Sequence, residues 1–168
     1  MDVTGIETVD VVIGSIVNFN PVKPISHPGP VNFYMAKAPT GASLAEFHEL
    51  APVWFKIYSD GPEFTSSGTL TWPTEFAETI PSSSRRLGGG VYLLRVVHIG
   101  LHLANFLNGA QLYVVCAHIS VSSGTGTMRP NLLSFPGAYS PEDPGFFINI
   151  YHPFPRSYTP PVGDVLVC

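Results

Sequence analysis

"QLYVVCAHISV" (residues 111–121) predicts a long β-strand and decides the fold class. Side chains along a strand point alternately to the two faces of a sheet, so Gln111 and Tyr113 share one face. The stretch "GVYLLRVVHIGLH" (90–102) precedes it and is equally rich in β-branched and aromatic residues. We expect these two segments to be the longest strands of an all-β protein.

Shorter stretches of the same kind are spread along the rest of the chain. With 16 Gly and 17 Pro among 168 residues, punctuated strands are favoured over helices, whose interiors both residues break. The spacing predicts an antiparallel β-sandwich with long loops, formed by residues 1–168 as a single domain. The further strands are expected at residues 11–20, 31–38, 53–59, 69–72, 76–80 and 146–151.

Composition argues against several partners. The net charge is −4, and no basic patch is present to neutralise phosphates, so we expect no nucleic acid. Every apolar stretch is interrupted within a few residues, so we expect no membrane span and no membrane partner. Few charges with much Pro, Ser and Thr favour a secreted protein. Cys116 and Cys168 allow one disulfide at most, and neither lies in a CxxC pair that would indicate structural zinc.

Common catalytic motifs are missing from the sequence. It contains no HExxH, GxSxG, P-loop or GxGxxG pattern. Glu142 and Asp143 are adjacent, so they cannot flank a glycosidic bond as a pair of catalytic carboxylates. The six histidines are scattered, and each taken singly is expected to have a structural role. Hydrolase, kinase and dehydrogenase functions therefore have little support.

One group of polar residues points to metal chemistry. In "GLHLANFLNGAQLY" (100–113), His102 precedes a loop, and Gln111 and Tyr113 follow it on one face of the next strand. If the flanking strands pair as a hairpin, His102 can approach both. Imidazole suits copper, a phenol can be a distant axial ligand, and an amide can hydrogen-bond an oxygen species. A buried polar cluster with no metal would produce the same pattern.

Blocks along the whole chain resemble a known family. "SHPGPVNFYMAKAP", "VWFKIY", "YLLR", "NGAQLYVVC" and "FPGAYSPEDPGFFINIY" with "SYTPP" are similar to the fungal lytic polysaccharide monooxygenases of auxiliary activity family nine. The blocks occur in the family's order, from about residue 10 to the C-terminal end. The match therefore rests on ordered blocks rather than on one motif.

The resemblance implies both a fold and an activity. The fold is an immunoglobulin-like β-sandwich whose flat face lies on cellulose. The activity is oxidative cleavage of β-1,4-glucan at C1 and/or C4 by a secreted monomer, using one copper ion, an external electron donor, and O2 or H2O2. Two alternatives stay open: a non-catalytic cellulose-binding β-sandwich that has lost its copper site, and a β-sandwich interaction protein whose polar cluster is structural.

The resemblance also assigns roles to individual residues. In the family's histidine brace, copper is held by the amine and imidazole of an N-terminal His, by a second His, and by an axial Tyr. The second His corresponds to His27 and the axial Tyr to Tyr113. His102 and Gln111 correspond to the side chains that hydrogen-bond the oxygen species. Tyr158 corresponds to an aromatic residue on the cellulose face, where we expect an exposed, flat ring.

The sequence departs from the family pattern at three places. It begins Met1-Asp2-Val3, so we expect the family's N-terminal strands and the copper-binding amine to be absent from it. Val96 and Val97 follow Arg95 where the family usually has His-Glu, and His98 comes directly after them. The family's cysteine at the Cys116 position pairs with an earlier one, which residues 1–20 do not contain.

Overall fold

A computed structural model describes residues 7–42, 47, 51–83, 87–126 and 130–166. No helix occurs in these residues, as the sequence predicts, and the all-β fold is confirmed. Accordingly, this part of the chain has no helix that could serve as a membrane span. Nine strands are present: β1 (Thr8–Val11), β2 (Ile16–Phe19), β3 (Val31–Lys37), β4 (Trp54–Ser59), β5 (Glu63–Phe64), β6 (Leu70–Thr71), β7 (Ile80–Ser83), β8 (Gly88–Gly100) and β9 (Gln111–Thr125).

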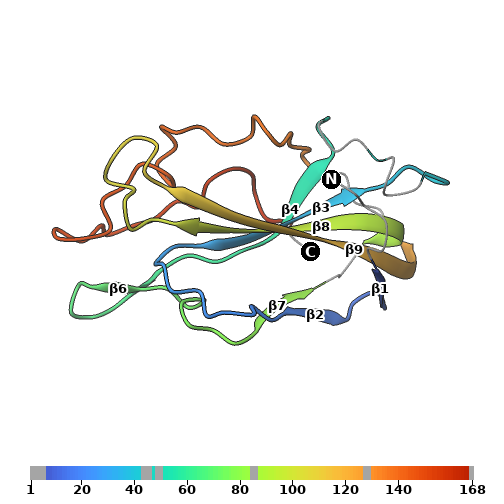
Figure 1. The fold of residues 1–168 in the computed structure, drawn as a ribbon, viewed down its shortest axis with the longest axis horizontal. Helices are drawn as coiled ribbons and strands as arrows, with labels where there is room; N and C mark the ends of the chain where they lie inside the picture. Colours follow the sequence, from blue (N-terminus) through green and yellow to red (C-terminus); the bar gives the residue numbers. More distant parts are fainter. Residues whose placement is uncertain (1–6, 43–46, 48–50, 84–86, 127–129, 167–168) are drawn as a thin grey trace.

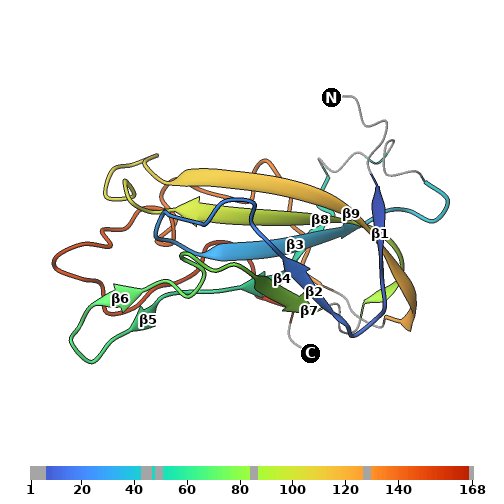
Figure 2. The same cartoon turned by 60° about the horizontal axis from the view of Figure 1, so that its bottom comes forward.

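The main sheet has five strands in the order β1-β9-β8-β3-β4 (Figures 1 and 2). Neighbouring strands are antiparallel except at one edge, where β1 runs parallel to the last part of β9. There Thr8 lies opposite His118 and Val11 lies opposite Val121. Two small antiparallel sheets, β2-β7 and β5-β6, complete the described strands.

The main sheet is covered on both faces, which explains why β3, an inner strand, is buried almost throughout. Along β3, Phe33 and Met35 pack into one apolar cluster, and Tyr34 and Ala36 pack into another. The first cluster includes residues of β2 and β7, and the second includes residues of the C-terminal segment 130–166. In Figure 1 these two layers lie on opposite sides of the sheet. The arrangement is a β-sandwich in which a long coil replaces much of one layer.

Three of the predicted strands differ from the structure, at residues 11–20, 146–151 and 76–80. The segment 11–20 begins with the last residue of β1 and contains β2 after a turn, in which Gly14 adopts a φ of +82° and Ser15 N–H bonds to the carbonyl of Val12. The segment 146–151 is not a strand. Its alternation of apolar and polar residues reflects burial, since Phe146 and Ile150 pack into the second cluster. Its backbone is not paired with a strand: among the described backbone bonds of residues 146–151, only that from Ile148 N–H to the carbonyl of Ala104 leaves the C-terminal segment.

Residues 76–80 also differ from the prediction. A turn over residues 73–76 ends at Phe76, which has a positive φ of 62°, and an irregular segment leads from it to Ile80, the first residue of β7. The Phe76 N–H donates to the carbonyl of Ile25 at 2.8 Å, so the turn supports the loop before β3.

A buried lysine attaches the C-terminal segment to the sheet. Lys56 on β4 is 2% exposed, and its ammonium donates to the carbonyl of Pro161 at 2.7 Å. The backbone of Lys56 also accepts a bond from Leu166 N–H. Burial lowers the pKa of Lys56 to about 8, while Asp143 and Asp164 act in the opposite direction. The tail therefore has a fixed position against the edge strand β4.

Candidate functional site

The loop that carries His27 is attached to the end of β8 by backbone bonds. Leu101 N–H donates to the carbonyl of Pro28 at 2.8 Å, and Ile99 N–H donates to the carbonyl of Pro30 at 3.0 Å. Between these anchors Gly29 lies so close to Ile99 that a β-carbon there would be 1.8 Å from the Ile99 carbonyl oxygen. The Pro-Gly-Pro turn therefore places His27 over the end of the sheet.

The β8–β9 hairpin brings the other site residues to the same place. His98 lies opposite Tyr113, and Gly100 lies opposite Gln111. His102 comes two residues after Gly100, at the start of the loop that joins the strands. The predicted hairpin pairing is therefore present in the structure, and residue alternation puts Gln111 and Tyr113 on the same face.

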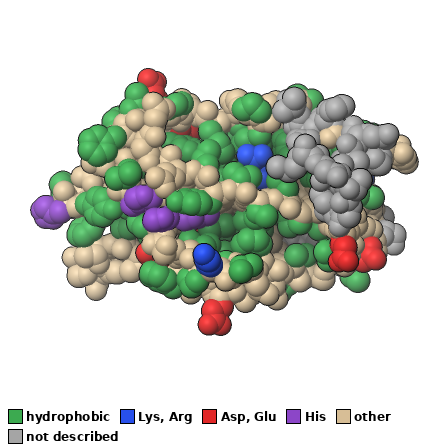
Figure 3. Space-filling view, in the orientation of Figure 1, with side chains coloured by type: hydrophobic (Ala, Val, Ile, Leu, Met, Phe, Trp, Pro, Cys, Tyr) green, Lys and Arg blue, Asp and Glu red, His purple; other side chains and the backbone are tan. Residues whose placement is uncertain are grey.

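Four rings lie next to one another at this end of the sheet. The His27 ring stacks on His102 with centroids 4.2 Å apart and on Tyr113 at 5.7 Å, and Tyr113 stacks on His98 at 5.5 Å. Side-chain atoms of His27, His102 and Tyr113 all lie within 3.3–3.4 Å of the point where a β-carbon on Gly100 would be. Figure 3 shows histidine side chains gathered at the left of the molecule.

Hydrogen bonds fix the orientation of two of these rings. The Tyr113 hydroxyl donates to Gln111 Oε1 at 2.7 Å. His98 Nε2 lies 3.0 Å from the carbonyl oxygen of His27. Because a carbonyl only accepts, Nε2 carries the proton and donates it. Burial lowers the pKa of His98 to about 4, so its ring is neutral at pH 7.

The donors around Gly100 fit part of a copper site. His27 and His102 supply imidazole nitrogens and Tyr113 a phenol oxygen, which are ligands that copper accepts. His102 Nδ1 is buried and has no hydrogen-bond partner in the structure, so it is available to a ligand. Within the described ranges, no group of three or more His, Cys, Asp or Glu side chains could hold a metal by itself. A complete copper site therefore needs further ligands.

The expectation for Tyr158 is wrong with respect to exposure. The residue is half-buried, and its ring packs edge-on against Trp72, with centroids 5.2 Å apart and an interplanar angle of 87°. Its hydroxyl donates to the carbonyl of Gly145 at 3.0 Å, and burial raises its pKa. The ring is not freely exposed as expected, because the loop packs Tyr158 against the second apolar cluster.

Another tyrosine has the properties expected of Tyr158. Tyr151 is 49% exposed, and its hydroxyl donates to the carbonyl of His102 at 3.1 Å. Exposed aromatic rings at Phe106, Phe147 and Phe154 are contributed by the same two loops. The run of aromatic residues in 146–154 could have indicated this exposed surface. It was overlooked because residues 146–151 were interpreted as a strand.

His98 is the second site residue that the sequence did not assign. It is only 8% exposed, and it lines a groove of about 430 Å³ together with His27 and Tyr113. The sequence could have indicated His98 because it lies directly opposite Tyr113 when the two predicted strands are paired in the correct register. The register of that hairpin was needed to recognise it.

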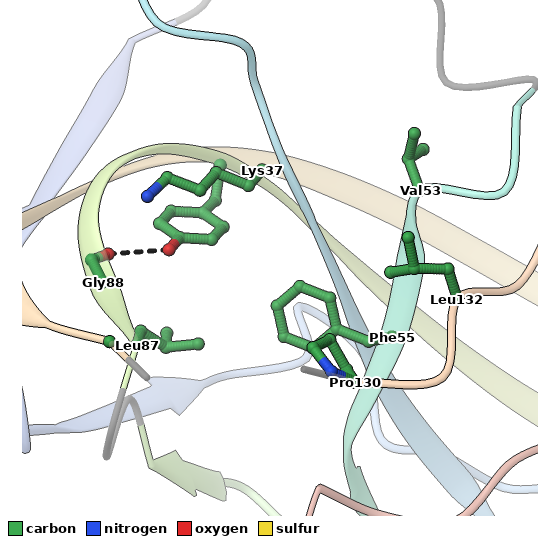
Figure 4. Close-up of a pocket in the computed structure, with 9 residues that line it drawn as sticks. Lys37, Val53, Phe55, Leu87, Gly88, Pro130 and Leu132 are labelled. Carbon is green, nitrogen blue, oxygen red and sulfur yellow. Dashed lines mark hydrogen bonds between the residues drawn. The ribbon is translucent and has the colours of Figure 1, made fainter. Parts of the chain in front are cut away.

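A separate cavity of about 260 Å³ lies at the other end of β3, near Lys37 (Figure 4). Its walls are mostly apolar and include Phe55, Leu87 and Leu132. The hydroxyl of Tyr92 donates to the carbonyl of Gly88 at 2.6 Å, which closes one side. Lys37 and Val31 are at opposite ends of a seven-residue strand, so the cavity is about 20 Å from the ring stack.

Comparisons with known proteins match one family along most of the chain. A sequence model of Auxiliary Activity family 9 (formerly GH61) matches residues 2–158. The chain is 50% identical over 159 residues to AA9 family lytic polysaccharide monooxygenase C of Emericella nidulans, covering 92% of this chain and 66% of that protein. It is 48% identical over 160 residues to monooxygenase A of Thermothielavioides terrestris, covering 92% and 67%. It therefore spans about two thirds of the length of these relatives.

A solved structure shows the same fold. Cel61B of Hypocrea jecorina, described as a glycoside hydrolase family 61 member, superposes with a TM-score of 0.82 at 25% identity. The superposition covers 96% of this chain and 71% of that chain.

Proposed function

Because the chain belongs to auxiliary activity family 9, the lytic polysaccharide monooxygenases, we propose that it cleaves β-1,4-glucan with one bound copper ion. The family itself establishes oxidative breakage of polysaccharides as the enzyme class. The proposal adds cellulose as the substrate, C1 and/or C4 as the position of attack, and action outside the cell. The observation that carries it is the meeting of His27, His102 and Tyr113 over Gly100.

His27 and Tyr113 would hold the metal in this proposal. The His27 imidazole offers a strong nitrogen donor on a loop that Pro28 and Pro30 attach to β8. The Tyr113 hydroxyl donates a hydrogen bond to Gln111. The lone pairs on the phenol oxygen therefore remain available for a weak contact to the metal. Bound copper supplies one-electron chemistry that activates O2 or H2O2 with electrons from an external donor.

His102 and Gln111 would manage protons and hydrogen bonds beside the metal. Gln111 uses its carbonyl oxygen to accept from Tyr113, so its NH2 group can donate to an oxygen co-substrate. His102 Nδ1 is buried without a partner, and a ring nitrogen in this state can give or take a proton. These two side chains would thus act on the co-substrate while His27 and Tyr113 bind the metal.

The first prediction tests this division of roles through Gln111→Ala. The protein is incubated with copper, a reductant and cellulose, and oxidised oligosaccharides are measured by mass spectrometry. We expect the variant to form them roughly 10- to 100-fold more slowly, since it lacks a donor aimed at the oxygen co-substrate. Its Cu(II) affinity should stay within a few-fold of the parent.

The matched control is Leu112→Ala, because the side chain of Leu112 points to the other face of β9. Equal rates for Gln111→Ala and the parent would remove Gln111 from the mechanism. Cellulose binding by the parent without any oxidised product would favour the non-catalytic binding module instead.

An exposed aromatic surface beside His102 would contact the polysaccharide. Aromatic rings stack on the apolar faces of glucose units, and Tyr151 is attached directly to the site loop through the His102 carbonyl. In Figure 3 hydrophobic side chains lie next to the gathered histidines. We therefore transfer the substrate-contact role from Tyr158 to Tyr151.

The second prediction is that Tyr151→Ala weakens binding to crystalline cellulose about 2- to 12-fold. The estimate follows from about 0.5–1.5 kcal/mol for one aromatic stacking contact. Tyr151→Phe keeps the ring and loses only the bond to His102, so it should retain most of the binding. Binding isotherms on cellulose measure both variants. Equal loss in the two variants would mean that the hydroxyl anchor, rather than the ring, is what matters.

A further inference from the structure

His98 occupies a position where a polar ring needs an explanation. It lies near the end of the central strand β8, opposite Tyr113 in β9 and opposite Val31, the first residue of β3. Its side chain is 8% exposed and shares its face of β8 with Leu94 and Val96, which pack in the first apolar cluster. An apolar residue would be expected at such a site, because burying an imidazole costs desolvation energy.

The imidazole of His98 is hydrogen-bonded to the backbone of His27. Its Nε2–H donates to the His27 carbonyl oxygen at 3.0 Å. Two neighbouring loop residues, Pro28 and Pro30, accept hydrogen bonds from backbone N–H groups at the end of β8. At His27 the corresponding hydrogen bond comes from the His98 side chain. This bond fixes the peptide plane of His27 and with it the direction in which the His27 ring leaves the backbone.

The same ring also supports Tyr113. The two rings stack with centroids 5.5 Å apart and an interplanar angle of 22°. His98 thus contacts both residues that would hold the metal. It lies on their buried side, so it is less accessible to solvent than they are. Tyr113 is 44% exposed, so His98 supports its ring on the buried side, together with the His27 ring and the hydroxyl bond to Gln111.

We propose that His98 is a positioning residue that holds His27 and Tyr113 in the arrangement required to bind the metal. The metal-binding part of this inference rests on the proposed function. The positioning part concerns the protein alone and can be measured without metal. Removing a group that orients a metal ligand typically lowers metal affinity 10- to 100-fold.

The test compares His98→Leu with His98→Gln. Leucine fills similar space without a donor, whereas the glutamine amide can donate to the His27 carbonyl. In metal-free protein, nuclear Overhauser effects between the His27 and His102 rings report their stacking at 4.2 Å. We expect the Leu variant to lose these effects and the Gln variant to keep them. With copper, the Leu variant should bind Cu(II) about 10- to 100-fold more weakly, with an altered electron paramagnetic resonance spectrum.

Circular dichroism checks that each variant is folded, and His118→Leu, farther along β9, is the matched control. Retention of the ring contacts in metal-free His98→Leu would overturn the proposal, whatever the copper result. If the Leu variant does not fold, loss of the ring contacts in folded His98→Gln would overturn it instead. A parent protein that binds no copper, combined with lost contacts in His98→Leu, would support the positioning role while the proposed function fails.

Discussion

Replacing His27 with alanine is expected to weaken Cu(II) binding by at least about 100-fold. Even residues that only orient a metal ligand contribute 10- to 100-fold to affinity, and His27 would be a direct ligand. A 100-fold change corresponds to about 2.7 kcal/mol of binding free energy. Isothermal titration calorimetry gives the affinity, and electron paramagnetic resonance shows whether a nitrogen ligand is lost. No other described side chain stacks on both His102 and Tyr113, so the alanine variant has no ring at the position of His27.

The control for His27→Ala is His152→Ala. His152 is an exposed histidine in the C-terminal segment, and its described ring contact is to Phe154 rather than to the site rings. It should leave Cu(II) affinity within about twofold of the parent. Parent-like binding by His27→Ala would show that the metal site lies elsewhere. An equal loss in His152→Ala would show that copper binds surface histidines without a defined site.

The strands could be predicted where alternation and pairing coincide. The segments 31–38, 53–59, 90–102 and 111–121 contain β3, β4, and most of β8 and β9, because each has a hydrogen-bonded neighbour along its length. The segment 146–151 has the same alternation, but it lies on the sheet's face rather than at its edge. Alternation reports which side chains are buried, and it does not report whether the backbone has a partner strand.

The site could be predicted only where the hairpin determines it. The grouping of His102, Gln111 and Tyr113 follows from two strands and one loop that are local in sequence. His27 is more than 70 residues away from them, and its assignment came from the family resemblance. The exposure of Tyr158 could not be deduced, since it depends on where Trp72 and Gly145 lie in the folded chain. Loop residues depend on tertiary contacts that no local pattern contains.

Gly29→Ala is expected to destabilise the protein by about 3–5 kcal/mol, which is roughly 10 °C in Tm for a domain of this size. Gly29 has a φ of +146°, a conformation that side chains rarely adopt. An added β-carbon would be 1.8 Å from the Ile99 carbonyl oxygen, a backbone atom within the sheet that cannot rotate away. The loop must therefore move, and the bonds from Leu101 to Pro28 and from Ile99 to Pro30 must stretch or break.

Gly68→Ala is the matched control, because Gly68 also has a positive φ, of +80°, but has nothing within 4 Å of the added β-carbon. It should cost only about 1 kcal/mol of backbone strain. Thermal and urea unfolding followed by circular dichroism measure both variants. Because Pro28 connects Gly29 to His27, a shifted loop should also reduce Cu(II) affinity in Gly29→Ala and not in Gly68→Ala. Equal stability of the two variants would mean that the loop yields easily, and the Pro-Gly-Pro turn would then not be what places His27 at the site.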